Sequence, residues 1–377
     1  MKILSTGLVL FLSSIMLLSS CDKKATEIPP LSIPTTYQSA DFATTAAAQI
    51  GVGKRLAGIT TEAKKGRVNG KTVGADSLNF WFTTSSPTLK SFNTSYFAGK
   101  FEGTTGWFAE IVKASGGTYT PSATIAGNGG TYGGYLFDEN GLEIEQLIEK
   151  GQFGSVSYNQ ATSLLSSTIT VETVDQVIAL FGANPTFPNT PTAAKTAQPD
   201  IFMANYAARR DKNDGKGFYT QIKEAFLKLQ AAVKAGNDYT KERDEAVATL
   251  KLTWEKVNAA TIVNYCHAVV STLSATAPTD AQKAAALHAY GECVGFTHGW
   301  RTIPQAQKKI TDAQIDEVLD LLNAPAMGTP TSYKFITEPV NQLPRLTQII
   351  TKLKSIYGFT DAEIEDFKSN WVSVQGR

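Results

Sequence analysis

Cysteine and histidine are scarce in this sequence, with three residues of each type among 377. Neither type forms a C-x-x-C or H-E-x-x-H pattern, so the motifs of structural zinc sites and of zinc-dependent peptidases are both missing. The sequence also lacks the G-x-x-x-x-G-K-[ST] loop of nucleotide-binding proteins and the G-x-S-x-G turn of many hydrolases. No local motif therefore indicates any of these classes.

An excess of charge of one sign is missing as well. The 35 Lys and Arg residues nearly balance the 34 Asp and Glu residues. A nucleic-acid-binding protein generally presents a basic surface, because much of its affinity comes from contacts with phosphates. The composition therefore gives no support to a nucleic acid as a partner.

The N-terminus carries an apolar run that is short for a membrane span. It follows Lys2, is bounded by small residues and predicts a secretory signal peptide over residues 1–20. The run ends at Leu18-Ser19-Ser20-Cys21, which resembles a bacterial lipobox, whose cysteine is acylated and becomes the first residue of the mature chain. We therefore expect a lipid anchor at Cys21 that attaches the protein to a membrane of the cell envelope. The expected location is the outer membrane, on its periplasmic face or at the cell surface.

A proline-containing segment with little hydrophobic content follows this cysteine. Residues 21–36 include Pro29, Pro30 and Pro34, and we interpret them as an extended, flexible tether. The folded part is then expected over residues 37–377. A second segment rich in Pro, Thr and Ala, at residues 182–200, is the best candidate for an internal boundary.

Helical patterns dominate the second half of the chain. Apolar residues recur every three or four positions from residue 218, and Gly236 is suited to end that helix. The next stretch, from Thr240 to about Ala275, contains no Gly or Pro and predicts a long helix. We expect an all-α fold, a helical bundle with irregular loops and few strands.

A recurring four-residue sequence predicts three further helix starts. Thr279, Thr311 and Thr360 are each followed by Asp-Ala and then Gln or Glu, which is a capping box. The Thr hydroxyl accepts a hydrogen bond from the amide three residues on, and the Asp favours the positive end of the helix. A last helix is predicted to begin at Pro344 and to stop at Gly358.

The candidate site lies in the helix after Thr279. His288 and Glu292 are four residues apart and share one face with several Ala and Gly residues. In one interpretation they are two ligands of a metal ion, completed by side chains from another helix. In the other, His288 donates to Glu292 as a buried pair that fixes the helix register. His298 points to another face of a straight helix and is not automatically a third ligand.

Two glutamates and two cysteines outside this pair are expected to have structural roles. Glu145 and Glu149 share a helical face that we expect to be solvated. With Cys21 acylated, Cys266 and Cys293 remain, both in apolar helical patterns. They are either joined in a disulfide, which export would permit, or free and buried.

Three blocks carry a resemblance to a known group of proteins. They are FDENGLEIEQLIEKGQFGSVSYNQ, FYTQIKEAFLKLQAAV and AALHAYGECVGFTHGW. They resemble an uncharacterised family of Bacteroidetes lipoproteins with a domain of unknown function, itself distantly similar to imelysin-like proteins. That similarity implies an exported or lipid-anchored protein linked to iron uptake and built as two packed four-helix bundles.

The imelysin-like motif Gly-x-His-x-x-Glu is not fully matched. Ala286 stands at the glycine, and one extra residue separates His288 from Glu292. One residue rotates the carboxylate by about 100° around the helix, so the family geometry cannot be carried over.

Two functions of different classes follow. The first is a non-catalytic, lipid-anchored envelope protein that binds a small ligand, with iron or another divalent metal as the implied cofactor. The second is a metallopeptidase using His288 and Glu292, which would need an open metal position and a general base. The sequence offers neither a third ligand nor a base, and therefore favours the first. A purely structural or adhesive surface protein is a further alternative.

Overall fold

The computed structural model describes residues 28–84, 86–124 and 127–377. From Leu31 to Arg377 the chain forms one compact unit, and residues 28–41 contain neither helix nor strand. The predicted signal peptide and Cys21 lie outside the described residues, so both stay predictions. In the described ranges, no helix combines the length and the apolar character needed to cross a membrane.

The described chain is almost entirely helical, which confirms the expected all-α bundle. Its α-helices are α1 (Phe42–Thr45), α2 (Ala47–Lys64), α3 (Ala75–Thr83), α4 (Leu89–Phe92), α5 (Ser95–Ala98), α6 (Trp107–Ala114), α7 (Ile144–Gln152), α8 (Asn159–Leu165), α9 (Val171–Phe181), α10 (Phe202–Arg209), α11 (Phe218–Ala235), α12 (Thr240–Leu273), α13 (Asp280–His298), α14 (Asp312–Leu321), α15 (Lys334–Thr337), α16 (Pro339–Tyr357), α17 (Asp361–Asp366) and α18 (Trp371–Gln375). Three short 3-10 turns, η1 (Lys65–Arg67), η3 (Asn237–Tyr239) and η4 (Gln305–Gln307), and a π-helix, η2 (Phe153–Tyr158), complete the helical elements. The strands β1 (Gly130–Tyr132) and β2 (Tyr135–Phe137) form an antiparallel hairpin, in keeping with the few strands that were expected.

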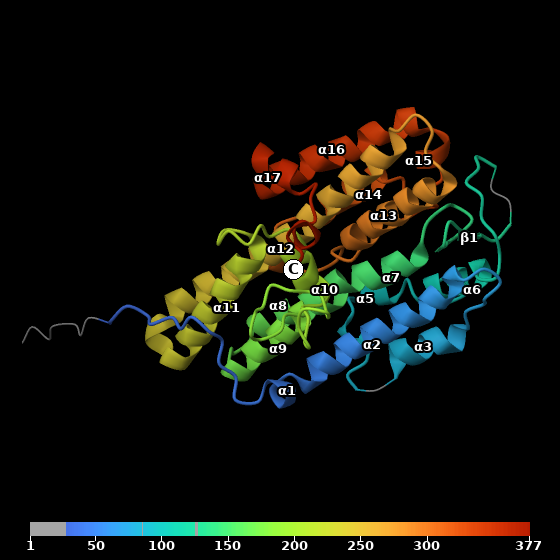
Figure 1. The fold of residues 1–377 in the computed structure, drawn as a ribbon. Coiled ribbons are helices and arrows are strands. Elements are labelled where there is room, and N and C mark those ends of the chain that lie inside the picture. Colours follow the sequence, from blue (N-terminus) through green and yellow to red (C-terminus); the bar gives the residue numbers. More distant parts are fainter. Residues whose placement is uncertain (1–27, 85, 125–126) are drawn as a thin grey trace, which may run out of the picture. The chain divides into compact units, whose positions relative to one another are not determined.

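The helices pack in a continuous series around α12 and α13. Helix α12, 34 residues long, contacts α10, α11, α13 and α16. Helix α13 in turn packs against α7, α7 against α2, and α2 against α3 and α9 (Figure 1). Segments that are distant in the sequence, such as residues 47–64 and 280–298, are thereby linked through α7.

The helix ends follow the local signals in the sequence. The side chains of Thr279, Thr311 and Thr360 accept from the amides three residues on, at 3.3, 3.1 and 3.1 Å, so all three capping boxes are confirmed. Gly236 follows the last residue of α11, and Gly358 ends α16 in a left-handed conformation with a φ of 68°. These ends needed no tertiary information, since each is set by residues within one turn.

The predicted start of the last long helix at Pro344 is wrong. Helix α16 begins five residues earlier, and Pro344 lies inside it. Pro339 occupies the first turn, where a missing N–H costs nothing. Inside the helix, Pro344 removes the hydrogen bond to the carbonyl of Val340, a residue that is exposed and open to water.

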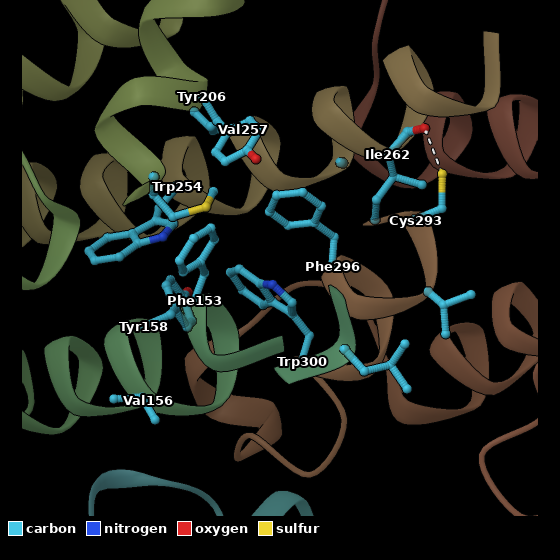
Figure 2. Packing of buried hydrophobic residues seen from close by; sticks show 14 of the residues in the cluster. Phe153, Val156, Tyr158, Tyr206, Trp254, Val257, Ile262, Cys293, Phe296 and Trp300 are labelled. Atoms are coloured by element: carbon cyan, nitrogen blue, oxygen red, sulfur yellow. Dashed lines mark hydrogen bonds between the residues drawn. The ribbon is translucent and has the colours of Figure 1, made fainter. Parts of the chain in front are cut away.

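Aromatic side chains fill the core between α12, α13 and η2. Trp254 of α12 meets Tyr158 of η2 edge-on at 5.5 Å between ring centroids, and Trp300 lies 4.2 Å from the same tyrosine. Phe153 and Phe296 meet nearby at 5.9 Å (Figure 2). These rings join the first residues of η2 to the C-terminal end of α13, so the aromatic core fixes one end of the α7–α13 pair.

The two cysteines outside the signal region are free and buried. The sulfur atoms of Cys266 and Cys293 lie 3.9 Å apart, between α12 and α13. The thiol of Cys293 also donates to the carbonyl oxygen of Ile262 at 3.7 Å (Figure 2). The second interpretation of these residues, as buried core thiols, is therefore the one that the structure shows.

The segment 182–200 lies within the compact unit. The buried carboxylate of Asp200 accepts from the amides of Asn184 and Thr190, each at 3.0 Å, and from the hydroxyl of Tyr219 at 2.9 Å. These bonds attach both ends of the segment to the start of α11. An internal domain boundary at this segment stays a prediction.

Candidate functional site: a buried charge cluster and an adjoining cavity

The site is organised by the close contact of α7 with α13. A Cβ atom at Gly295 would lie 2.4 Å from the backbone oxygen of Gln146, and one at Gly299 would lie 2.0 Å from that of Gly151. Both distances are far below van der Waals contact, so only glycine fits at these two positions. The small-residue stripe predicted around His288 therefore serves close helix packing.

His288 is held by a carboxylate, but the carboxylate is not Glu292. Its Nδ1–H donates to Oε2 of Glu143 at 2.6 Å. Glu143 directly precedes the first residue of α7. The ring also stacks on Tyr135 of β2, with centroids 4.3 Å apart and planes within 16°. Glu143 is completely buried, while the His288 side chain is 23% exposed. The predicted histidine–glutamate pair thus exists with a different glutamate.

Arg67 joins two buried carboxylates beside this pair. Its guanidinium lies 2.8 Å from Glu143 and also bonds Glu145, and its central carbon lies over the Tyr135 ring, 5.2 Å from the centroid. Glu145 is 1% exposed. Burial and the charges of Glu149 and Glu143 raise its pKa well above the ordinary value, against the opposing charge of Arg67.

Glu292 belongs to a separate buried contact. Lys150 lies between it and Glu149, at 3.2 and 2.8 Å respectively, and the Tyr206 hydroxyl donates to Glu292 at 3.4 Å. Burial alone would lower the pKa of Lys150, but the charges of Glu149 and Glu292 outweigh it and raise the pKa. Lys64 adds a second cation 3.1 Å from Glu149.

We call this set the α7 charge cluster; it comprises Lys64, Arg67, Glu143, Glu145, Glu149, Lys150, His288 and Glu292. The expectation that Glu145 and Glu149 face solvent is wrong, because α7 packs against both α2 and α13; the Glu145 side chain is 1% exposed and that of Glu149 is 18% exposed. Their charges are compensated by cations from α2, η1 and α7 itself.

The contacts do not supply the ligand set that a metal ion needs. A histidine whose Nδ1–H bonds a carboxylate can still bind metal through Nε2. Glu292, however, is neutralised by Lys150, and the described residues contain no group of three His, Cys, Asp or Glu side chains arranged around an ion. The metal role of His288 and Glu292 stays a prediction, and no catalytic step is derived from it.

A cavity of about 560 Å³ opens beside the cluster and is lined by residues of both α7 and α13. We call it the His298 cavity. Its back wall consists of Ile144 and Leu147 of α7 and Val294 and His298 of α13. Its remaining walls come from three segments, at residues 99–110, 138–142 and 324–330.

His298 is the buried polar residue of the back wall. It is 5% exposed and stands among the rings of Tyr96, Phe97 and Trp107. Burial and the nearby charges of Lys100 and Arg301 lower its pKa to about 3, so the ring is neutral at pH 7. Its Nε2 shares a hydrogen bond of 3.0 Å with the Tyr96 hydroxyl, and its Nδ1 has no partner among the described residues.

Asp138 is a buried acid of the cavity lining, in the segment at residues 138–142. Its Oδ1 accepts from the amides of Asn140 and Leu142 at 2.9 and 2.7 Å, a turn that the Asp-Glu-Asn-Gly sequence favours. Burial raises the pKa of Asp138 to about 7, although both backbone bonds oppose the shift. Beside it, Oδ1 of Asn140 is buried without a partner in the described chain.

Sequence reasoning missed the His298 cavity. His298 was set aside because it points away from the His288 face, which is the very orientation that brings it to the cavity. The Asp138 turn has a recognisable sequence, but the turn alone does not reveal that it faces Trp107 and α13. No local pattern could have joined lining segments that lie up to about 230 residues apart.

Fold and geometry thus define an all-α bundle with a ligand-sized cavity along one closely packed helix pair. A family model described as Domain of unknown function (DUF4856) matches residues 179–360. No curated protein and no solved structure matches the chain. The matched part carries His288, Glu292 and His298, whereas α7, Trp107 and Asp138 precede it. The match therefore covers only part of the cavity lining, namely Val294, His298 and the segment at residues 324–330.

Proposed function

We propose that this chain is a lipid-anchored, non-catalytic binding protein of the bacterial cell envelope, and that it holds a small organic ligand in the His298 cavity. The observation that carries the proposal is the cavity itself. Its volume of about 560 Å³ lies in the range of small-molecule sites, and its walls combine apolar side chains with a few buried polar groups.

The polar groups of the cavity are suited to orient a ligand. His298 and Asn140 are each less than a tenth exposed, and each has a ring nitrogen or amide oxygen without a partner in the described chain. A buried polar atom that lacks a hydrogen bond costs about 1–3 kcal/mol. Both atoms are shielded from solvent in this structure, so a ligand recovers part of this free energy only where a small side-chain shift opens them to the cavity.

The membrane attachment rests on the N-terminal sequence. The apolar run and Leu18-Ser19-Ser20-Cys21 support acylation at Cys21, and the extended residues that follow would separate the fold from the membrane. Replacement of this cysteine in Cys21→Ser should move the protein from the membrane fraction to the soluble fraction. A variant that remains with the membrane would contradict the anchor.

The iron-binding and metallopeptidase alternatives receive no support from the described contacts. His288 and Glu292 each bond protein groups, and their neighbours Arg67 and Lys150 are cations, which oppose the binding of a positive ion. The geometry therefore favours the cavity over this pair as the place of function.

Native mass spectrometry and thermal-shift screening of the purified protein test the cavity. Thr105 lines the cavity and is exposed, so Thr105→Trp should obstruct it without disturbing the core. Thr104→Trp, one residue away and outside the lining, is the matched control. We expect a ligand that stabilises the natural protein and the control but not Thr105→Trp. Binding that is equal in all three proteins would place the ligand elsewhere and refute the proposal.

A further inference from the structure

The charges that line the His298 cavity are mostly neutralised in pairs. Glu102 bonds Lys90 at 2.6 Å. Lys113 lies 3.3 Å from Glu110 and 2.6 Å from Glu139, and so serves both. These three contacts involve partly exposed side chains, whose charges water screens.

Two lining charges have no partner of opposite sign in the described chain. They are the carboxyl of Asp138 and the ammonium of Lys100. Lys100 donates to the backbone oxygen of Ala326 at 3.1 Å and lies 5.2 Å from the Tyr96 ring centroid. Neither contact neutralises its charge. One acid and one base of the same cavity thus remain uncompensated.

The pKa values of both groups are shifted in the direction that disfavours their charged forms. Burial shifts the pKa of Asp138 upward and, together with the charge of Arg301, shifts the pKa of Lys100 downward. Each shift disfavours the charged form. Both backbone bonds of the Asp138 carboxyl go to Oδ1, so neither backbone amide occupies Oδ2, which a ligand would share with the Asn140 side chain.

Apolar surface lies along the same cavity. Leu147 and Val294 belong to the back wall, and Trp107 and Pro325 stand on adjoining segments. A ligand that binds here therefore meets a cation, an anion and an apolar wall. A simple cation would leave Lys100 uncompensated, and a simple anion would be repelled by Asp138.

We propose that the His298 cavity binds a zwitterion, an amino acid or a short peptide with free termini, whose ammonium group bonds Asp138 and whose carboxylate bonds Lys100. The apolar wall receives its side chains. This inference rests on the proposed binding function and names its ligand class. Free amino acids and short peptides share this chemistry, and the length of the best ligand distinguishes them.

The probes are the twenty amino acids and a mixed dipeptide library, each offered free, N-acetylated and C-amidated to the purified protein. Native mass spectrometry selects the best ligand, and calorimetric titration measures its affinity. We expect each blocking group to weaken binding at least about tenfold, the scale of a lost bond to a charged group. Blocked forms that bind as well as the free ligand would overturn the proposal.

Two variants assign the ends of the ligand. In Asp138→Asn, N-acetylation should no longer weaken binding, while C-amidation still does. In Lys100→Gln the pattern should reverse. Lys90→Gln, which removes a charge outside the cavity, should retain both effects. Circular dichroism confirms that each variant is folded. A loss of both effects in one variant, or of neither in both, would refute the assignment.

The outcomes separate this inference from the function beneath it. If a sugar, an amine or a dicarboxylate binds and Thr105→Trp abolishes its binding, the cavity is a binding site but the assignment of a zwitterion as its ligand is wrong. If no compound of any class binds, the proposed function fails as well. Free amino acids that bind better than dipeptides would identify the shorter ligand, and the opposite result the longer one.

Discussion

Lys150 is the residue on which the stability of the α7 charge cluster depends most. Its side chain is 6% exposed and serves Glu149 at 2.8 Å and Glu292 at 3.2 Å. Glu149 has a second cation in Lys64, but Glu292, 7% exposed, has no other cation within 4 Å among the described residues. The substitution Lys150→Met keeps the length of the side chain and leaves one buried carboxylate uncompensated.

Removal of one member of a buried ion pair costs about 3–5 kcal/mol, which is a large part of the stability of an ordinary protein. We expect Lys150→Met to lower the free energy of unfolding by this amount in urea titrations followed by circular dichroism. The double variant Lys150→Met/Glu292→Gln should recover most of the loss, because no buried charge then remains alone. Lys228→Met is the matched control, since its partner Glu245 is half exposed and such pairs contribute about 1 kcal/mol or less.

A Lys150→Met protein within 1 kcal/mol of the natural one would refute this reasoning. It would mean that water or a proton neutralises Glu292 without cost. A double variant no more stable than the single one would locate the contribution of Lys150 in its contacts with the rings of Phe153 and Tyr206 instead.

Three further predictions concern other sites. The pKa of Asp138 in the folded protein is about 7, above the ordinary 3.8, so between these values the folded state keeps a proton that the unfolded chain loses. This group should therefore lower the free energy of unfolding by about 4 kcal/mol as the pH rises from 4 to 8. Urea titrations across this range should show a weaker pH dependence of stability for Asp138→Asn, and an unchanged pH dependence would contradict the assignment. His288→Ala leaves Glu143 without one partner and should cost about 1–3 kcal/mol, with no change in metal content by elemental analysis; a fall in bound metal would instead support the metal role. Thr311→Ala removes a helix cap and should cost about 1 kcal/mol in thermal unfolding, whereas Thr351→Ala, exposed in mid-helix, should cost nothing; equal losses would argue against the cap.

The parts of the fold that could be predicted from the sequence are those set by near neighbours. The starts at Thr279, Thr311 and Thr360 and the stops at Gly236 and Gly358 depend on residues within one helical turn. The Pro344 prediction failed for a related reason. A proline is favoured in the first turn, but a second proline five residues upstream had the same preference and began the helix.

The partners of the charged residues could not be predicted in this way. Glu143 and His288 are separated by 145 residues, and Glu145 and Arg67 by 78. A spacing of four residues places His288 and Glu292 on one face of α13. It does not show that α7 and the residue before it supply a different partner to each. In the sequence, the glutamates of α7 have the spacing of a solvated helix face. Only the packing of α2 and α13 against α7 shows that these side chains are largely covered.

The glycines of α13 determine how the cavity can respond to a ligand. Since Gly295 and Gly299 bring α13 against the backbone of α7, the spacing of these helices is fixed by main-chain atoms that have no rotamers to change. The back wall, which both helices form, should therefore keep its shape if the proposed ligand binds. Adjustment to ligands of different size is left to the front segments at residues 99–106 and 324–330, so selectivity by shape resides in the helices and tolerance in the loops.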